Sequence, residues 1–139
     1  MLKKTISIVI PCFNEENNIE NTYKEITKVT KSEVHYSFDY IFVDDGSVDN
    51  TFFKIKELAT KDLKVKCIKL SRNFGSHISI SAGFEHVLKS DAAILITSDL
   101  QEPPDIISKL IRKWENGTDI VWTVRKFRNQ SILMNIITT

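Results

Sequence analysis

The chain has 139 residues, of which 42% are hydrophobic and 27% are charged, a balance typical of one soluble globular domain. Its 19 basic and 18 acidic residues give a net charge of +1, which argues against a general nucleic-acid binder. Two cysteines, Cys12 and Cys67, are too few for a disulfide framework, and the apolar stretches are too short to span a bilayer. We therefore expect a cytosolic domain with reduced thiols.

Strand and helix periodicities alternate along the chain. Runs of β-branched or alternating apolar residues predict strands, and apolar residues three and four positions apart predict amphipathic helices. In chain order we expect a strand at 6–10, a helix at 16–29, a strand at 40–43, a helix from 47 or 49 to 59, a strand at 65–70, a helix at 76–89, a strand at 92–96, a helix at 103–114 and a strand at 119–124. The third strand is expected near an edge, and Ile78, Ala82 and Val87 of the third helix are expected to face the sheet.

Five strands joined by four helices indicate a mainly parallel sheet with right-handed crossovers and helices on both faces. We expect an α/β fold, a three-layer αβα Rossmann-like domain with strand order 3-2-1-4 and a further strand. Residues 1–139 are expected to form one domain. The basic run Arg125–Arg128 and the apolar segment Ser131–Ile137 fit this scheme least, so residues 125–139 are interpreted as the start of a C-terminal region of a longer chain.

Acidic residues follow three of the predicted strands. Glu15 comes after the first strand, Asp44 and Asp45 after the second, and Asp99 after the fourth. The carboxyl ends of parallel strands share one rim of the sheet, and ligands bind there where the strand order reverses. Carboxylates that crowd one rim repel each other unless a cation or hydrogen-bond donors lie between them. A divalent metal with an anionic ligand would supply that compensation.

Glycine-based phosphate cradles are absent from the sequence. There is no GxGxxG and no GxxxxGK[ST], and the chain has only four glycines. A nucleotide would therefore be held through a metal and side chains. A carboxylate such as Asp44 can accept hydrogen bonds from ring N–H groups or hydroxyls.

Four motifs in this order resemble family 2 glycosyltransferases of the GT-A fold. They are Ile8–Glu16 (IVIPCFNEE), Val43–Asp49 (VDDGSVD), Leu70–Gly75 (LSRNFG) and Ser98–Pro104 (SDLQEPP). The last two are most similar to the branch that glycosylates polyprenyl phosphates, which includes dolichol-phosphate mannose synthase. The resemblance covers residues 6 to about 125 and implies a GT-A nucleotide-sugar-binding domain.

The resemblance implies a role for each matching residue. The donor-binding residues would be Pro11, Phe13, Asn14, Glu15, Val43, Asp44, Asp45, Arg72, Thr97, Ser98 and Arg125. Asp99 and Gln101 would hold a divalent metal, Mg²⁺ or Mn²⁺, on the donor diphosphate. The implied activity is sugar transfer with inversion from a nucleotide sugar, with UDP favoured, to polyprenyl phosphate or to a saccharide. The implied location is the cytoplasmic, inner face of the membrane, with the membrane surface and no nucleic acid as partner.

One position departs from the family pattern. Thr97 stands where the family has the first aspartate of Asp-x-Asp, which leaves one carboxylate of the usual two. The sequence identifies no catalytic base. It would lie beyond Thr139, or a phosphate acceptor, ionised at neutral pH, would not need one.

Three other interpretations remain open. A non-catalytic nucleotide-sugar binder fits the same motifs. A phospho-acceptor receiver domain also places acids at strand ends, but it needs its acidic pair after the first strand and a lysine after the fifth, where this chain has Arg125. In the third interpretation, these residues have only structural roles: Asp44–Ser47 form a turn with a helix cap, and Asp99 introduces a helix.

Overall fold

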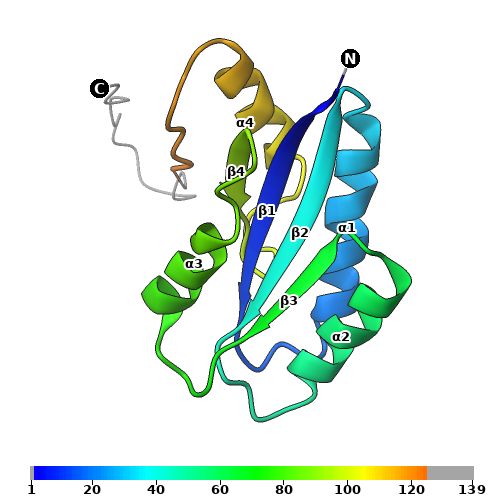
Figure 1. Cartoon of the computed structure of the whole chain (residues 1–139), viewed down its shortest axis with the longest axis vertical. Helices are drawn as coiled ribbons and strands as arrows, with labels where there is room; N and C mark the ends of the chain where they lie inside the picture. Colours follow the sequence, from blue (N-terminus) through cyan, green and yellow to red (C-terminus); the bar gives the residue numbers. More distant parts are fainter. Residues whose placement is uncertain (1, 125–139) are drawn as a thin grey trace, which may run out of the picture.

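The computed structural model describes residues 2–124, in which four strands and four helices alternate (Figure 1). The elements are β1 (Lys4–Cys12), α1 (Ile19–Ser32), β2 (Tyr36–Asp44), α2 (Thr51–Lys61), β3 (Val65–Lys69), α3 (Ser76–Glu85), β4 (Ala92–Leu95) and α4 (Ile106–Glu115). Each helix connects two strands or follows the last one, so every described strand is the start of a β–α unit. The predictions for Arg125 and for Ser131–Ile137 lie outside the described residues.

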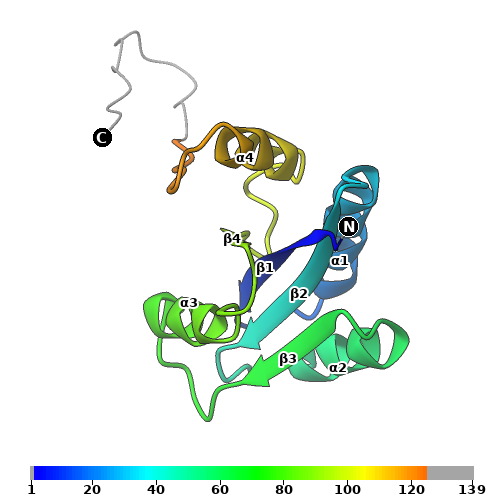
Figure 2. The same ribbon diagram turned by 45° about the horizontal axis from the view of Figure 1, so that its top comes forward.

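All the described strands are parallel, in the order β3-β2-β1-β4. The predicted parallel sheet, its strand order and the edge position of the third strand are therefore confirmed. Helices α1, α2 and α4 cover one face of the sheet and α3 covers the other, which gives the predicted three layers (Figure 2).

The two faces of the sheet separate the core into two clusters. Alternate residues of β1 and β2, such as Ile8 and Phe42, point toward α1, α2 and α4 and pack with Ile26 and Ile55. The residues between them form a smaller cluster under α3, made of Val9, Ile41 and Val43. Because successive side chains of a strand point to opposite faces, the same strands build both clusters. Both faces of the central strands are therefore buried, as expected for a parallel sheet.

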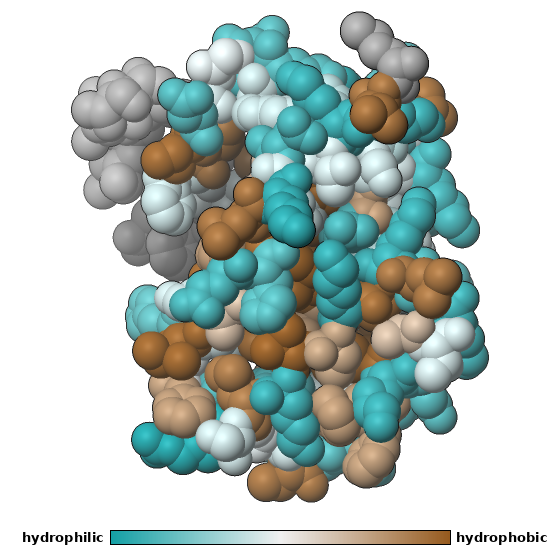
Figure 3. Space-filling model, viewed as in Figure 1, coloured by the Kyte–Doolittle hydropathy of each residue, from teal (hydrophilic) through white to brown (hydrophobic). Residues whose placement is uncertain are grey.

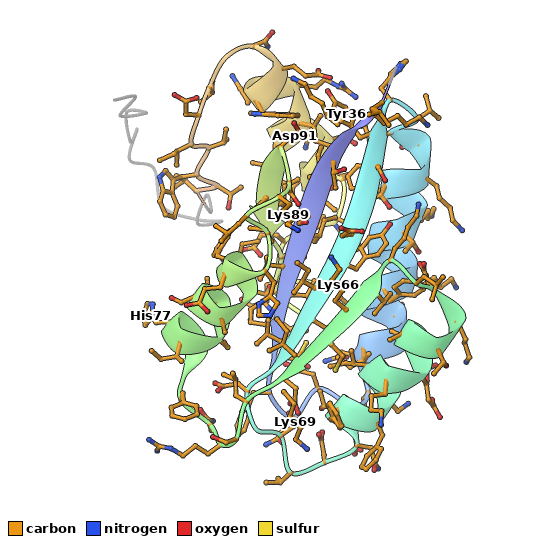
Figure 4. All side chains as sticks on the ribbon, in the orientation of Figure 1. Tyr36, Lys66, Lys69, His77, Lys89 and Asp91 are labelled. Carbon is orange, nitrogen blue, oxygen red and sulfur yellow. The ribbon has the colours of Figure 1, made fainter. Side chains whose placement is uncertain are left out.

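Polar contacts fix α4 at the amino end of the strands. The Tyr36 hydroxyl donates to Glu115, and Arg112 pairs with Glu115 and with the buried carboxylate of Glu33. Figure 4 shows Tyr36 at this end and Lys69 at the opposite end, where β3 stops. The loops that follow the strands therefore meet at the Lys69 end.

The predicted fifth strand is wrong for the described part of the chain. Residues 119–124 form no strand there, and Trp122 is 84% exposed. Figure 2 shows the segment after α4, which lines a cavity of about 770 Å³ together with Leu95 and Ile106. Hydrophobic residues are exposed on the surface of the molecule (Figure 3), and Ile120 and Val124 of this segment are among the exposed ones. The β-branched and aromatic residues of this segment favour an extended backbone, but such residues form a strand only when a partner strand is in register.

The third helix is shorter than predicted and is oriented differently. It ends at Glu85, and Ile78 is 51% exposed, so the prediction that Ile78 faces the sheet is wrong. Ala82 and Val87 do pack on the cluster under α3, as predicted. The weak apolar periodicity of this helix explains the error, because serines and small residues occupy much of its inner face.

Gly83 sets how closely α3 approaches the sheet. A Cβ at this position would lie 2.4 Å from Val9 Cγ1 and 3.1 Å from Val43 Cγ2. We expect Gly83→Ala to lower the free energy of unfolding by about 1–3 kcal/mol, although alanine is the better helix former, because the valines have little freedom to move. Urea unfolding of this variant, with the exposed neighbour Ser81→Ala as control, tests the prediction. A stabilised Gly83→Ala protein would contradict this packing.

Candidate functional site

A cavity of about 340 Å³ opens at the carboxyl end of the sheet, between β1, β4 and the start of α3. Glu15, Asp45 and Asp99 all line it, although 84 positions separate the first from the last. Its other lining residues are Pro11, Cys12, Phe13, Asn73, Gly75, Ser76, Ser79, Thr97 and Ser98. The parallel order brings these loops together because β1 and β4 are neighbours.

The loops after β1 and β2 are joined by reciprocal hydrogen bonds. The Asn14 side chain accepts from the Val48 backbone N–H at 3.0 Å, and the Asn14 N–H donates to the Ser47 hydroxyl at 2.9 Å. Two residues on, Glu16 and Asp49 pair in the same way with backbone groups of the opposite loop. Asn14, which has a positive φ of 52°, therefore acts in the structure as a link between loops. These bonds position Glu15 at the cavity.

Asp49 is held in the second of these loops by several donors. Its carboxylate accepts from the Thr51 N–H at 3.0 Å and from the Thr51 hydroxyl at 2.6 Å, and it also bonds the Glu16 N–H. Burial acts to raise the pKa of Asp49, but these hydrogen bonds outweigh it and hold the pKa below its ordinary value.

Helices α1 and α2 begin later than predicted, at Ile19 and Thr51, because the residues before them form the two loops that these hydrogen bonds join.

Asp44 is the buried acid at the end of β2. It is fully buried, and its Oδ1 atom accepts from the Ser47 N–H at 3.1 Å. Among residues 2–124, Asp44 Oδ2 is the one buried side-chain nitrogen or oxygen without a hydrogen-bond partner. A buried polar atom left without a partner costs free energy, so such an atom needs an explanation. A ligand that donates a hydrogen bond would supply one.

Asp45 points to the loop between β3 and α3. Its Oδ1 accepts from the Phe74 N–H at 2.8 Å and its Oδ2 from the Gly75 N–H at 2.9 Å. Gly75 is the residue before α3 and has a φ of +94°, a conformation that glycine adopts readily. The carboxylate of Asp45 thus holds the entry to the helix whose first turn forms one wall of the cavity.

Gly46 allows the same loop to pass close to the turn after β2. It has a φ of +68°, and a Cβ there would lie 2.3 Å from the Arg72 carbonyl carbon. We expect Gly46→Ala to lower the free energy of unfolding by about 3 kcal/mol or more, since both the backbone conformation and the close contact oppose a side chain. The matched control is Gly117→Ala, where φ is +87° but nothing lies within 4 Å, so only about 1–2 kcal/mol is expected. Equal losses in thermal unfolding would contradict the contact.

The segment after β4 carries the remaining acid of the cavity. The Asp99 carboxylate accepts from the Gln101 N–H at 3.2 Å and from the Gln101 side-chain amide. Burial acts to raise the pKa of Asp99, but hydrogen bonds from Thr97 and Gln101 lower it further than burial raises it, so its pKa lies below the ordinary value of an aspartate. The stability that the Asp99 carboxylate contributes is therefore present above the ordinary pKa of an aspartate and is lost as the pH falls through the lower pKa of the folded protein.

Two contacts place the Asp99 segment. The Ser98 carbonyl accepts from the Thr22 hydroxyl of α1 at 2.6 Å, and Leu100 has a positive φ of 51°. A non-glycine residue in this region is uncommon and occurs often at functional sites. The Thr97 hydroxyl lies between two carboxylates, since it bonds Asp99 and its Oγ1 is also 3.3 Å from an oxygen of Glu102.

Cys12 forms part of the cavity but is not suited to nucleophilic chemistry. It is 3% exposed, and its thiol donates to the Ile10 carbonyl at 3.3 Å. Burial raises the pKa of the Cys12 thiol, and nearby Glu15 and Asp44 raise it further. Cys67, which is half-buried, has a pKa raised to about 11 by burial. Both thiols therefore stay protonated at neutral pH.

The predicted residues fall into two groups. Those that line the cavity are Pro11, Phe13, Glu15, Asp45, Thr97, Ser98 and Asp99. Those outside its lining are Asn14, Val43, Asp44, Arg72 and Gln101. Sequence reasoning missed Cys12, Gly75, Ser76 and Ser79, although the LSRNFG motif that contains Gly75 was a signal for that loop. Ser79 is buried on the inner face of α3 and left no comparable signal.

The oxygen ligands around Asp99 suit a divalent cation that arrives with a phosphate ligand. No group of three or more His, Cys, Asp or Glu within residues 2–124 is arranged to hold a metal. Mg²⁺ is commonly bound by one or two carboxylates together with substrate phosphates, so Asp99 and the amide of Gln101 fit such a site.

Within residues 2–124, no helix has the length and apolar character needed to cross a membrane.

Relatives of known sequence match all or most of this chain. Putative glycosyltransferase CsbB of Bacillus subtilis is 37% identical over 139 residues, which are 100% of this chain and 42% of that protein. Undecaprenyl-phosphate 4-deoxy-4-formamido-L-arabinose transferase of Pseudomonas fluorescens is 38% identical over 127 residues, 91% of this chain and 37% of that protein. The chain thus spans less than half the length of these relatives.

Solved structures share the fold. TarS of S. aureus in complex with UDP-GlcNAc matches with a TM-score of 0.61 and 21% identity over 83% of this chain and 32% of that one. The mannosyltransferase PcManGT of Pyrobaculum calidifontis, in complex with GDP-Man and Mn²⁺, matches with a TM-score of 0.60 and 15% identity over 71% of this chain and 28% of that one.

The family model Glycosyl transferase family 2 matches residues 7–134. The chain therefore belongs to glycosyltransferase family 2, as its motifs predicted.

Proposed function

We propose that this chain is the nucleotide-sugar-binding part of an inverting glycosyltransferase that uses a UDP-sugar, a divalent cation and polyprenyl phosphate. The observation that carries the proposal is the cavity lined by Glu15, Asp45 and Asp99, next to a buried Asp44 that has one unused carboxylate oxygen. The cavity is open at the carboxyl end of a parallel sheet, the end at which such sheets bind their ligands.

The hydrogen-bonding state of Asp44 favours uracil over guanine. The Ser47 N–H bonds Oδ1, and Oδ2 is the oxygen of Asp44 that has no partner. Uracil has a single ring N–H between two carbonyl groups and needs one such acceptor. Guanine presents a ring N–H beside an amino group, a pair that is best matched by both oxygens of a carboxylate. The single unpartnered oxygen of Asp44 therefore matches the single ring N–H of uracil.

The diphosphate would lie between Asp99 and the start of α3. Gly75, Ser76 and Ser79 form this wall of the cavity, and the partial positive charge at a helix N-terminus favours a bound anion. The cation, when bound by Asp99 and Gln101, would neutralise the charge that develops on the leaving diphosphate. The Thr97 side chain would place an uncharged hydroxyl beside the proposed cation site, so the phosphates would supply most of the ligands of the cation.

The acceptor is proposed to be a polyprenyl phosphate at the cytoplasmic face of a membrane. Support comes from the SRNFG and SDLQEPP motifs and from the relative named an undecaprenyl-phosphate transferase. A phosphate acceptor is ionised near neutral pH and can attack without a general base, which agrees with the lack of an identified one. Arg125 is proposed to contact the donor phosphates, and the basic run Arg125–Arg128 has the charge that an anionic lipid surface attracts.

The proposal is tested by calorimetric titration with UDP and with GDP, each with and without MnCl₂, followed by transfer from UDP-sugars to a short polyprenyl phosphate. We expect UDP to bind more tightly than GDP, and Mn²⁺ to strengthen binding. Metal-dependent binding without transfer would favour a non-catalytic nucleotide-sugar binder. Transfer to a saccharide alone would replace the acceptor, and the lack of any nucleotide binding would overturn the proposal.

A further inference from the structure

The turn after β4 brings Glu102 back to Thr97, the residue that stands in place of the family aspartate. Thr97 Oγ1 lies 3.3 Å from Glu102 Oε2, and the same hydroxyl bonds the carboxylate of Asp99. From this geometry we infer that Glu102 supplies the second negative charge of the cation site at Asp99, the charge that Thr97 lacks. The inference rests on the proposed function, because it assigns a further residue to the cation that accompanies the donor.

The backbone of the turn explains how Glu102 comes to lie beside Thr97. The Leu100 N–H donates to the Thr97 carbonyl at 3.3 Å, and Leu100 has a positive φ of 51°, so the chain turns back on itself after Asp99. Pro103 follows Glu102 directly, and its ring restricts the backbone where the chain approaches α4. The half-buried side chain of Glu102 is therefore held next to Thr97 by the fold of the turn.

Glu102 and Asp99 lie in two cavities that meet at Thr97. Asp99 lines the cavity at the carboxyl end of the sheet, Glu102 lines the cavity of about 770 Å³ beside β4, and Thr97 lines both. Glu102 is for this reason outside the lining of the smaller cavity, although the Thr97 hydroxyl reaches the carboxylates of both acids. The second charge would thus approach the cation from the side of the larger cavity.

Two carboxylates at one hydroxyl form an arrangement that a cation would stabilise. A threonine hydroxyl has a single proton, so it can donate to Asp99 or to Glu102 but not to both at once. Like charges held close together repel each other, and a divalent cation bound near them removes that cost. The chain thus keeps two carboxylates for the cation, with the second supplied from position 102 instead of position 97.

The test is the factor by which MnCl₂ strengthens UDP binding, measured by calorimetric titration with and without the metal. This factor compares each variant with itself, so general damage to the nucleotide pocket cancels. We expect Glu102→Gln to lower the factor by about tenfold, because the attraction of a carboxylate to a divalent cation is strong at short range. Asp105→Asn is the matched control, since its carboxylate lies three positions further along and pairs with Lys109 at 3.4 Å, and it should leave the factor unchanged.

The double variant of Thr97→Asp and Glu102→Gln separates a role in charge from a role in hydrogen bonding. If Glu102 supplies charge, Glu102→Gln lowers the factor by about tenfold in the Thr97→Asp background too, and the double variant returns to about the value of the natural chain. A double variant equal to Thr97→Asp alone would show that Glu102 only orients the Thr97 hydroxyl, which would overturn the inference.

The same titrations distinguish a failure of this inference from a failure of the proposed function. If Mn²⁺ strengthens UDP binding by the same factor in the natural chain and in Glu102→Gln, the inference is wrong and the proposed function stands. If the natural chain does not bind UDP, or binds it equally well without Mn²⁺, the proposed metal-dependent donor site is overturned, and the role of Glu102 is overturned with it.

Discussion

Asp44→Asn is expected to weaken UDP binding by about 10- to 100-fold and at the same time to stabilise the ligand-free protein by about 1 kcal/mol. The loss of affinity follows because a hydrogen bond to a charged acceptor contributes about 1.5–3 kcal/mol. The gain in stability follows because Oδ2 is buried without a partner, and a neutral amide costs less to bury than a carboxylate. Calorimetry with UDP and urea unfolding without it measure the two effects.

The control for this prediction is Asp49→Asn. Asp49 lies five residues away, but its carboxylate is bonded by the Thr51 N–H and hydroxyl and by the Glu16 N–H. Its replacement should lower the free energy of unfolding by about 1–2 kcal/mol, because bonds to a charged acceptor are lost. The two substitutions are chemically identical, so opposite signs separate a carboxylate kept for a ligand from one kept for structure. If Asp44→Asn destabilised the protein as much as Asp49→Asn, the assignment of Asp44 to a ligand would lose its basis.

Thr97→Asp is expected to increase the affinity for Mn²⁺ in the presence of UDP by about tenfold. The change restores the second carboxylate of the family pattern beside Asp99, and charge attraction to a divalent cation at short range is worth several kcal/mol before desolvation is subtracted. Without metal, the new carboxylate would lie near both Asp99 and Glu102, so the same variant should be less stable than the natural chain. The effect of Thr97→Asp on the free energy of unfolding should therefore change sign, from a loss without ligands to a gain when metal and UDP are added.

Thr97→Asn provides the control, because it has nearly the same size as aspartate and no charge. Binding of Mn²⁺ can be followed by the paramagnetic signal of the free ion, which does not depend on turnover. We expect no gain in affinity for Thr97→Asn. If neither variant bound Mn²⁺ more tightly than the natural chain, a metal site at Asp99 would be contradicted. If both variants bound Mn²⁺ more tightly than the natural chain, the added charge would not be the cause.

Local patterns were sufficient to predict most of the fold. β-Branched runs such as Ile6–Ile10 are buried on both faces, which requires a central parallel strand, and helices with a clear apolar stripe followed them. The pattern failed for Ile78, because α3 has many small polar residues on its inner face, and for residues 119–124, because strand pairing depends on a distant partner. Both failures concern contacts between elements.

The site shows the same division. Order along the chain and the rule for parallel sheets placed Glu15, Asp45 and Asp99 on one rim, and they line one cavity. Their individual hydrogen bonds could not be predicted, because the partners of Asp45 are backbone N–H groups about 30 residues away, which carry no residue identity. The free oxygen of Asp44 was equally invisible, since it depends on the burial of its surroundings.

The most direct test of the site is a crystal structure of the chain grown with UDP and MnCl₂. We predict that the uracil ring N–H donates to Asp44 Oδ2 and that Mn²⁺ binds Asp99 and the diphosphate. A nucleotide bound away from the cavity, with its base remote from Asp44 and the cation remote from Asp99, would contradict the account.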